Sequence, residues 1–181
     1  MANMNTRTVL ITQGAIIAAA YILLTLPLAQ VTFGPLQFRL AEALTVLPLL
    51  TPAAIPGLFL GCLLSNAFNP AALGPIDIVF GSLATLVAAW LTWRFGRRFF
   101  KPGQERISWK TLMALLPPVI INGLVVGFYL PFILPEMEPD PMVVASTILT
   151  VALSEAVVVF LVGVPLLIGL DKSGIFSPRG N

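Results

Sequence analysis

The amino-acid sequence predicts an all-α membrane protein with six transmembrane helices, a short second helix, and N- and C-termini in the cytoplasm. Two observations on the whole chain lead to this fold class. Of the 181 residues, 57% are hydrophobic and only 10% are charged, whereas about 25% are charged in an ordinary soluble domain. Apolar runs also follow one another along the chain, separated by proline and glycine clusters. We therefore expect residues 1–181 to form a single transmembrane domain.

The first apolar run covers residues 9–29 and follows Arg7. It has the length of one membrane crossing and no small-residue cleavage site behind it, so it predicts a spanning helix rather than a signal peptide. Residues 30–38 include Gly34-Pro35 and predict a loop or hairpin toward the outer side of a cavity. The other runs cover residues 40–50, 53–68, 76–93, 112–134 and 142–170.

The second run is short, because residues 40–50 reach only about 16 Å as an α-helix. The charges indicate that it nevertheless crosses separately from residues 53–68. The connection 94–110 carries six basic residues against Glu105, a net charge of +5, and is expected in the cytoplasm, as are Arg7, Lys172 and Arg179. An even number of crossings then precedes this connection, which requires two within residues 40–68. The acidic connection 136–140 is placed outside.

The composition excludes several kinds of chemistry. The chain has no histidine and one cysteine, Cys62, so we expect no metal site and no imidazole catalysis, and we expect Cys62 to be a small buried hydrophobe. No phosphate-binding loop precedes Lys110 or Lys172, so we expect no cofactor in this chain, and any ATP is hydrolysed by partner subunits. The net charge of +2 does not indicate a nucleic-acid partner, because the basic residues lie at helix ends, as a lipid bilayer requires.

Four charged residues lie within or at the ends of the apolar runs: Arg39, Glu42, Asp77 and Glu155. A charged side chain at the centre of a membrane helix costs about 2.5–3.5 kcal/mol, so such residues mark substrate or ion sites. Arg39 and Glu42 can instead form a structural pair, since they are three residues apart on one helix face. Asp77 can instead favour a helix N-terminus. Glu155 has only Val and Ala at the helical spacings of three and four.

Once Arg39 pairs with one acid, two carboxylates remain uncompensated in the apolar interior. A cationic ligand, or one rich in hydrogen-bond donors, would balance them. The amides of Gln37, Asn66 and Asn122 can add donors and acceptors to such a site, or can bond a helix backbone or a neighbouring helix instead.

Small residues recur at a spacing of four on the first helix, at Gly14, Ala15, Ala18 and Ala19. Such a face permits close approach of another helix. Glycine pairs at the same spacing occur at 57 and 61 and at 123 and 127, so internal packing explains the pattern equally well.

Several motifs carry a resemblance to a known family. They are Gln37-Phe38-Arg39-Leu40-Ala41-Glu42-Ala43-Leu44, Leu47-Pro48-Leu49, Thr51-Pro52-Ala53-Ala54-Ile55-Pro56-Gly57-Leu58, Gly61-Cys62 with Asn66, and Asp77-Ile78-Val79-Phe80-Gly81-Ser82-Leu83-Ala84-Thr85. In these motifs the chain resembles the QueT family of queuosine-precursor transporters. The resemblance is specific between about residues 13 and 90, and it continues after Trp93 at Asn122 and Glu155. Ser154 stands where the family pattern has glycine.

The resemblance implies the substrate-binding component of an energy-coupling-factor (ECF) transporter, an ABC-type importer, in the bacterial cell membrane. Such a component captures a vitamin or precursor from outside. It then docks through small residues of its first helix, here Ala15 and Ala19, onto a transmembrane coupling subunit driven by two ATPase subunits. The implied ligands are 7-deazaguanines, namely preQ0 with its cyano group, preQ1 with its aminomethyl group, or the base queuine.

For these ligands, the resemblance implies Glu42 and Glu155 as acceptors for the ring N–H groups and the amine, in either order. Asp77 and Asn122 would support them, Arg39 would orient the ligand, and an aromatic ring would stack on it. No covalent chemistry is expected. The candidate substrate-binding residues are Gln37, Phe38, Arg39, Glu42, Asn66, Asp77, Asn122, Tyr129 and Glu155.

Two other functions are compatible with the intramembrane charges. One is a stand-alone proton-coupled carrier for a small cationic or nucleobase-like solute, with Glu155 as the proton site. The other is a small intramembrane enzyme with catalytic carboxylates, against which the absence of histidine counts.

Overall fold

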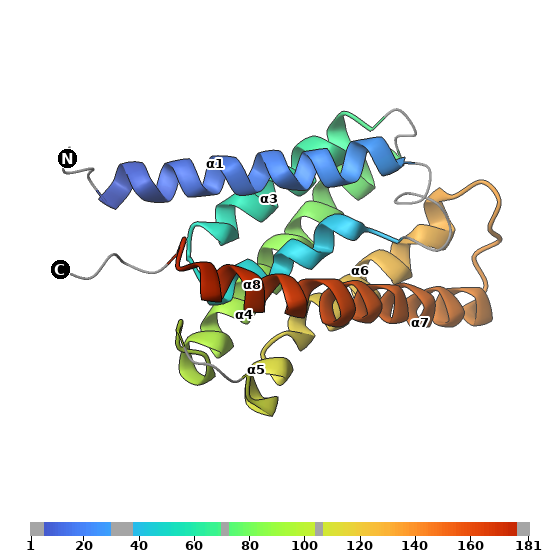
Figure 1. Ribbon diagram of the computed structural model, residues 1–181. Helices are drawn as coiled ribbons and strands as arrows, with labels where there is room; N and C mark the ends of the chain where they lie inside the picture. The colour runs from blue at the N-terminus through green and yellow to red at the C-terminus, as the bar shows by residue number, and fades with distance from the viewer. Residues whose placement is uncertain (1–5, 30–37, 70–72, 104–106, 177–181) are drawn as a thin grey trace.

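The computed structural model describes residues 6–29, 38–69, 73–103 and 107–176. Every regular element in these ranges is helical (Figure 1). In chain order the elements are α1 (Thr6–Thr25), η1 (Leu26–Leu28), η2 (Leu40–Leu49), α3 (Ala54–Ala67), η3 (Asp77–Gly81), α4 (Ser82–Phe99), α5 (Trp109–Met113), α6 (Leu116–Ile133), α7 (Pro141–Val157), η4 (Val158–Gly163) and α8 (Val164–Ser173).

The helices correspond to the six predicted apolar runs. In the described part of the chain, four helical segments are long and apolar enough to cross a membrane: Thr6–Leu28, Asp77–Phe99, Trp109–Ile133 and Pro141–Ser173. Leu40–Leu49 and Ala54–Ala67 are shorter apolar helices. The all-α class is therefore confirmed, and the structure has four segments of spanning length where six crossings are predicted.

Local chemistry sets several helix ends. Asp140 caps α7, because its carboxylate accepts hydrogen bonds from the backbone N–H groups of Met142 at 2.7 Å and Val143 at 3.1 Å. Pro141 follows at the first helical position, where its missing N–H costs nothing. At the other end of this long segment, Gly174 has φ +68° and terminates α8. The predicted run 142–170 is thus a helical segment with defined ends.

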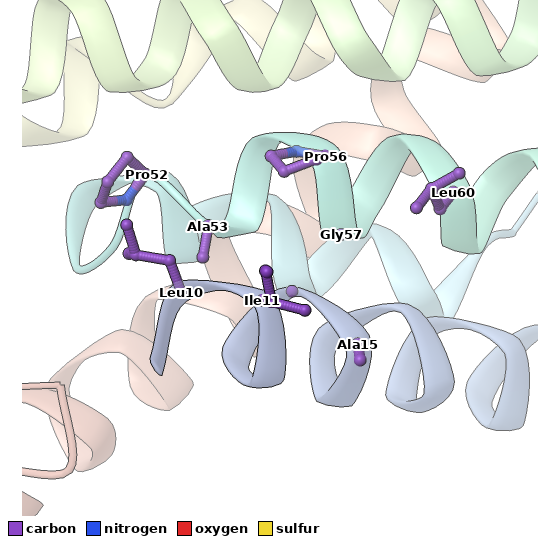
Figure 2. A pocket seen from close by; sticks show the side chains of 9 residues that line it. Leu10, Ile11, Ala15, Pro52, Ala53, Pro56, Gly57 and Leu60 are labelled. Atoms are coloured by element: carbon purple, nitrogen blue, oxygen red, sulfur yellow. The ribbon is translucent and has the colours of Figure 1, made fainter. Parts of the chain in front are cut away.

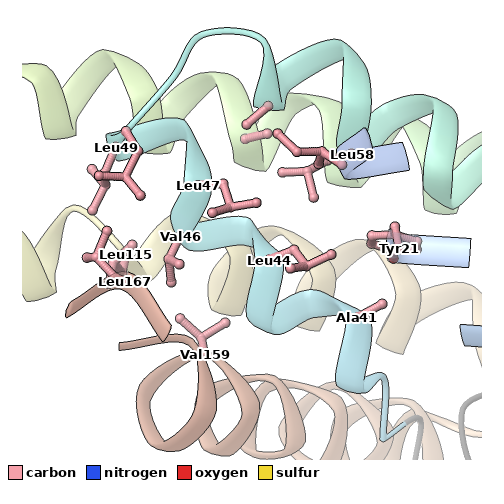
Figure 3. Packing of buried hydrophobic residues seen from close by; sticks show 14 of the residues in the cluster. Tyr21, Ala41, Leu44, Val46, Leu47, Leu49, Leu58, Leu115, Val159 and Leu167 are labelled. Atoms are coloured by element: carbon pink, nitrogen blue, oxygen red, sulfur yellow. The ribbon is translucent and has the colours of Figure 1, made fainter. Parts of the chain in front are cut away.

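Helix η2 is a ten-residue 3₁₀ helix at the centre of the bundle. It packs against α1, α3, α4, η4 and α8, and residues 41–49 are all buried. In Figure 3 its Leu44, Val46 and Leu47 lie among side chains from these surrounding helices. The α-helical rise from which the length of this segment was predicted is wrong, because the segment is a 3₁₀ helix. At about 2.0 Å per residue, ten residues reach about 20 Å rather than about 15 Å.

Helices α1 and α3 are in close contact because glycines face the contact from both sides. A Cβ atom at Gly57 would lie 2.7 Å from the carbonyl oxygen of Gly14, and one at Gly61 would lie 2.6 Å from the Cβ of Tyr21. Both distances are too short for a side chain. Ala15 and Ala19 lie on a different side of α1 and are exposed. The small residues of the first helix therefore divide into an internal packing face and an outward one.

Candidate functional site

A buried polar cluster lies between η2 and the helices around it. Its members come from five segments of the chain and are each at most 8% exposed. Arg39, Glu42, Asp77 and Glu155 are also the charged side chains that are buried in the part of the chain that the structure describes. The cluster consists of Tyr21, Arg39, Glu42, Asp77, Asn122, Tyr129 and Glu155.

One half of the cluster is organised around Asp77. Its Oδ1 atom accepts a hydrogen bond from the Arg39 guanidinium at 3.1 Å, which is also an ion pair, and another from the Tyr129 hydroxyl at 2.6 Å. The alternative pair of Arg39 with Glu42, three residues away, is not the ion pair that forms. The reason is that Arg39 precedes η2 in an extended conformation and turns toward the helix that begins at Asp77.

The backbone at Asp77 has its own partner. Asn66 donates from Nδ2 to the Asp77 carbonyl oxygen at 3.0 Å. Residues 77–81 form a π-helical turn, which leaves the ordinary α-helical bonding pattern, and such turns are frequent at functional sites. Because its partner is the Asp77 carbonyl oxygen, the amide of Asn66 bonds to helix backbone, which is one of the two roles predicted for it.

The other half of the cluster contains two acids. Glu42 accepts a hydrogen bond from the Tyr21 hydroxyl at 2.5 Å through Oε1, and Glu155 accepts one from Asn122 Nδ2 at 2.9 Å through Oε1. Glu42 also interacts with Asn122 and Glu155. Within the described residues, however, its second oxygen, Oε2, is buried and makes no hydrogen bond of good geometry. The two acids therefore lie together, with acceptor capacity left over.

The charges of the cluster do not balance. Its one cation, Arg39, is paired with Asp77, so Glu42 and Glu155 are left without a cation of their own in the cluster. Buried carboxylates are costly unless hydrogen bonds or positive charge satisfy them. A ligand with N–H donors would supply such hydrogen bonds, and a ligand with a protonated amine would also supply positive charge. No group of three or more His, Cys, Asp or Glu side chains in the described ranges is placed to hold a metal ion.

A small cavity adjoins the two halves of the cluster. A cavity of about 10 Å³ lies between Arg39, Asn122, Val126, Val151 and Glu155. That is about the smallest space that holds one water molecule. A bicyclic ligand that occupies this cavity therefore requires the side chains or helices around it to move apart.

Most members of the cluster, but not all, are among the residues predicted from the sequence. Six of the nine candidate residues are cluster members, and Asn66 contacts the cluster through backbone. Phe38 is 36% exposed, and Gln37 lies outside the described residues. Tyr21 was missed. The available signal was its place on α1, at helical spacing from Gly14 and Ala18 on the face that packs against α3.

Besides the buried cluster, the structure has a groove at its surface, between α1 and α3 near the beginning of both helices (Figure 2). Its volume is about 430 Å³, and Ala15 and Gly57 line it from opposite helices. Every residue along it is apolar or glycine: Leu10, Ile11, Gly14, Ala15, Pro52, Ala53, Pro56, Gly57 and Leu60.

Helices of spanning length around a buried polar cluster define a multi-pass membrane protein of the cell membrane, with a polar site at its centre. The comparison with protein families makes this more specific. The chain belongs to the QueT transporter family, whose model matches residues 11–172.

A curated relative is the queuosine precursor transporter QueT of Lactococcus lactis subsp. cremoris (strain MG1363). It is 33% identical over 96 residues, which cover 50% of this chain and 55% of the relative. The match thus spans about half the length of that protein. No solved structure matches the chain.

Proposed function

We propose that this chain is the substrate-capture subunit of an ECF-type importer and that its ligand is a queuosine precursor, a 7-deazaguanine such as preQ1, preQ0 or queuine. The observation that carries the proposal is the buried pair of Glu42 and Glu155 without a cation of its own in the cluster. Membership of the QueT transporter family supports transport, and the name of the Lactococcus relative supports this substrate class.

The chemistry of the ligand suits the cluster. The guanine-like edge presents adjacent N–H groups, which one carboxylate accepts through both oxygens. An aminomethyl group is protonated and adds a charge-assisted hydrogen bond to a second carboxylate. In the proposal Glu42 and Glu155 take these two roles and Asn122 supports them. Arg39, fixed by Asp77, orients the ligand, and Tyr129 or Phe38 stacks on it.

A panel of related bases tests this substrate class. Guanine-like 7-deazapurines should raise the melting temperature of the purified protein, and the shift should grow with concentration, because only the folded chain binds. Adenine-like analogues should give little shift, since they present an acceptor where guanine presents its ring N–H. Equal shifts from both kinds of base would contradict the substrate class.

The proposal includes six crossings with both termini in the cytoplasm. In Figure 1 the beginning of α1 and the end of α8 lie at the same end of the bundle as the connection from α4 to α5. That connection follows Arg94, Arg97 and Arg98. The connection from α6 to α7, with Glu136, Glu138 and Asp140, lies at the opposite end. This separation of basic and acidic ends supports the orientation, because basic connections stay in the cytoplasm.

The proposed partners are a transmembrane coupling subunit and two ATPase subunits. The sequence contains no phosphate-binding loop for hydrolysing ATP itself. Ala15 and Ala19 are exposed on α1, and Ala15 lines the apolar groove that α1 forms with α3. Small exposed residues let another helix approach closely, so we place the coupling subunit on this face.

Ala15→Leu and Ala19→Leu should each lower uptake while ligand binding stays unchanged. The added side chain holds the partner helix away, because membrane helices approach closely only where small residues face the contact. Uptake of labelled preQ1 into vesicles that contain the coupling subunits measures this. Ala145→Leu, the same change on an exposed part of α7, is the control. Normal uptake by both α1 variants would mean that this face of α1 contacts lipid and does not bind the coupling subunit.

A further inference from the structure

Tyr21 connects the first helix to the polar cluster. It lies in α1, is 1% exposed, and its hydroxyl donates to Glu42 Oε1 at 2.5 Å. The carboxylate that it contacts belongs to η2, 21 residues further along the chain. The only other tyrosine, Tyr129, donates to Asp77. Each tyrosine hydroxyl thus donates a hydrogen bond to a different carboxylate.

The packing under Tyr21 fixes the direction of its ring. A Cβ atom at Gly61 would lie 2.6 Å from the Tyr21 Cβ and 3.0 Å from its Cγ, so glycine is what lets the ring lie against α3. Leu58 and Cys62 of the same helix are fully buried in the core cluster that contains Tyr21. A ring that is enclosed in this way holds its hydroxyl in one place.

The consequence for Glu42 is an asymmetric carboxyl group. Oε1 is occupied by the Tyr21 hydroxyl, whereas Oε2 is buried and makes no hydrogen bond of good geometry within the described residues. Oε2 is therefore the oxygen that is left to accept a hydrogen bond from a ligand. A carboxyl group with one oxygen held and the other open has little rotational freedom left to lose on binding.

We infer that Tyr21 is a positioning residue of the substrate site, which orients the Glu42 carboxyl so that its open oxygen accepts the N–H groups of the ligand. This inference rests on the proposed function, because it concerns binding of the same 7-deazaguanine. Tyr21 does not itself touch the ligand in this role, and it acts through Glu42. Its side chain thereby determines how well the site distinguishes an N–H donor from an acceptor at the ligand edge.

A double-mutant cycle tests the inference. Tyr21→Phe should weaken binding of preQ1 by about 3-fold to 10-fold, as expected for the loss of one hydrogen bond. Combined with Glu42→Gln, the same change should alter affinity by less than about 2-fold, because the acceptor that Tyr21 positions is already altered. Tyr21→Phe should also reduce the preference for guanine-like over adenine-like bases, which a purely structural tyrosine would leave unchanged. Calorimetric titration of the full-length chain in detergent gives all these affinities.

Tyr129→Phe is the matched control, since it removes the same oxygen from the contact with Asp77. Its effect on affinity should persist largely unchanged when Glu42→Gln is added. Equal effects of Tyr21→Phe with and without Glu42→Gln, or an unchanged preference between the bases, would overturn the inference. So would a Tyr21→Phe variant that no longer unfolds cooperatively, because Tyr21 would then be needed for the fold. If the parent chain binds no 7-deazaguanine, the proposed function itself is wrong. If the parent binds and Tyr21→Phe binds equally well, only the role of Tyr21 is wrong.

Discussion

Glu42→Gln and Glu155→Gln are each expected to weaken binding of a 7-deazaguanine by roughly 10-fold to 150-fold. A hydrogen bond to a charged group contributes about 1.5–3 kcal/mol, and this range converts to that loss of affinity. The amide keeps the shape of the side chain but replaces one acceptor oxygen with a donor, which faces the N–H groups of the ligand. Both acids are at most 3% exposed, so water does not replace the lost acceptor. Calorimetric titration with preQ1 measures the effect.

The same experiment contains its own controls. Both variants should remain folded, because removing a buried charge that has no cation of its own lowers the cost of burial. Glu138→Gln makes the identical change at an exposed acid in the connection from α6 to α7 and should leave affinity unaltered. Unchanged dissociation constants for both Glu42→Gln and Glu155→Gln would rule out this assignment of the site.

Arg39→Met should lower the free energy of unfolding by about 3–5 kcal/mol, the range measured when one partner of a buried ion pair is removed. Arg39 and Asp77 have side chains only 7% and 2% exposed. Without the guanidinium, the Asp77 carboxylate retains the Tyr129 hydroxyl but has lost its cation. Methionine fills a similar volume, so the loss reports on charge rather than on a cavity.

The partner variant separates the ion pair from other effects of Arg39. Adding Asp77→Asn to Arg39→Met removes the stranded charge, so the double variant should be more stable than Arg39→Met alone. Equilibrium unfolding in detergent, with denaturant, gives the comparison. A double variant as unstable as Arg39→Met would mean that the contact with Asp77 is not what Arg39 contributes.

The fold could be predicted to a large extent because lipid imposes simple rules. Apolar runs of spanning length must become helices, since their backbone groups find no water to bond, and the ends of α3 and α6 fall within a few residues of the predicted runs. The 3₁₀ form of η2 could not be predicted in this way. Residues 41–49 are buried on every side, so the hydrophobic pattern carries no period that distinguishes one helical bonding scheme from another.

The site could be predicted in composition but not in its pairing. Charged residues in apolar runs indicated a common polar site, and the structure brings Arg39, Glu42, Asp77 and Glu155 together. However, the ion-pair partner of Arg39 lies 38 residues away in the chain. Helical spacing in a sequence predicts contacts only between neighbours on one helix. Tyr21 was not predicted as a site residue for a related reason. Its helical spacing from Gly14 and Ala18 could have indicated that its ring packs against another helix, but it does not indicate that the hydroxyl meets a carboxylate from another segment.

The small volume of the cavity beside Glu155, about 10 Å³, has a kinetic consequence. A ligand that occupies this cavity binds only those molecules in which the cavity has opened, and the apparent dissociation constant is then the intrinsic one divided by the open fraction. The association rate must level off at the rate of opening when ligand is abundant. Affinity in this protein is therefore set in part by the packing of Val126 and Val151 around this cavity and of the helices that carry them. Substitutions that loosen this packing would speed capture, and they would also shorten the time for which a captured molecule is retained.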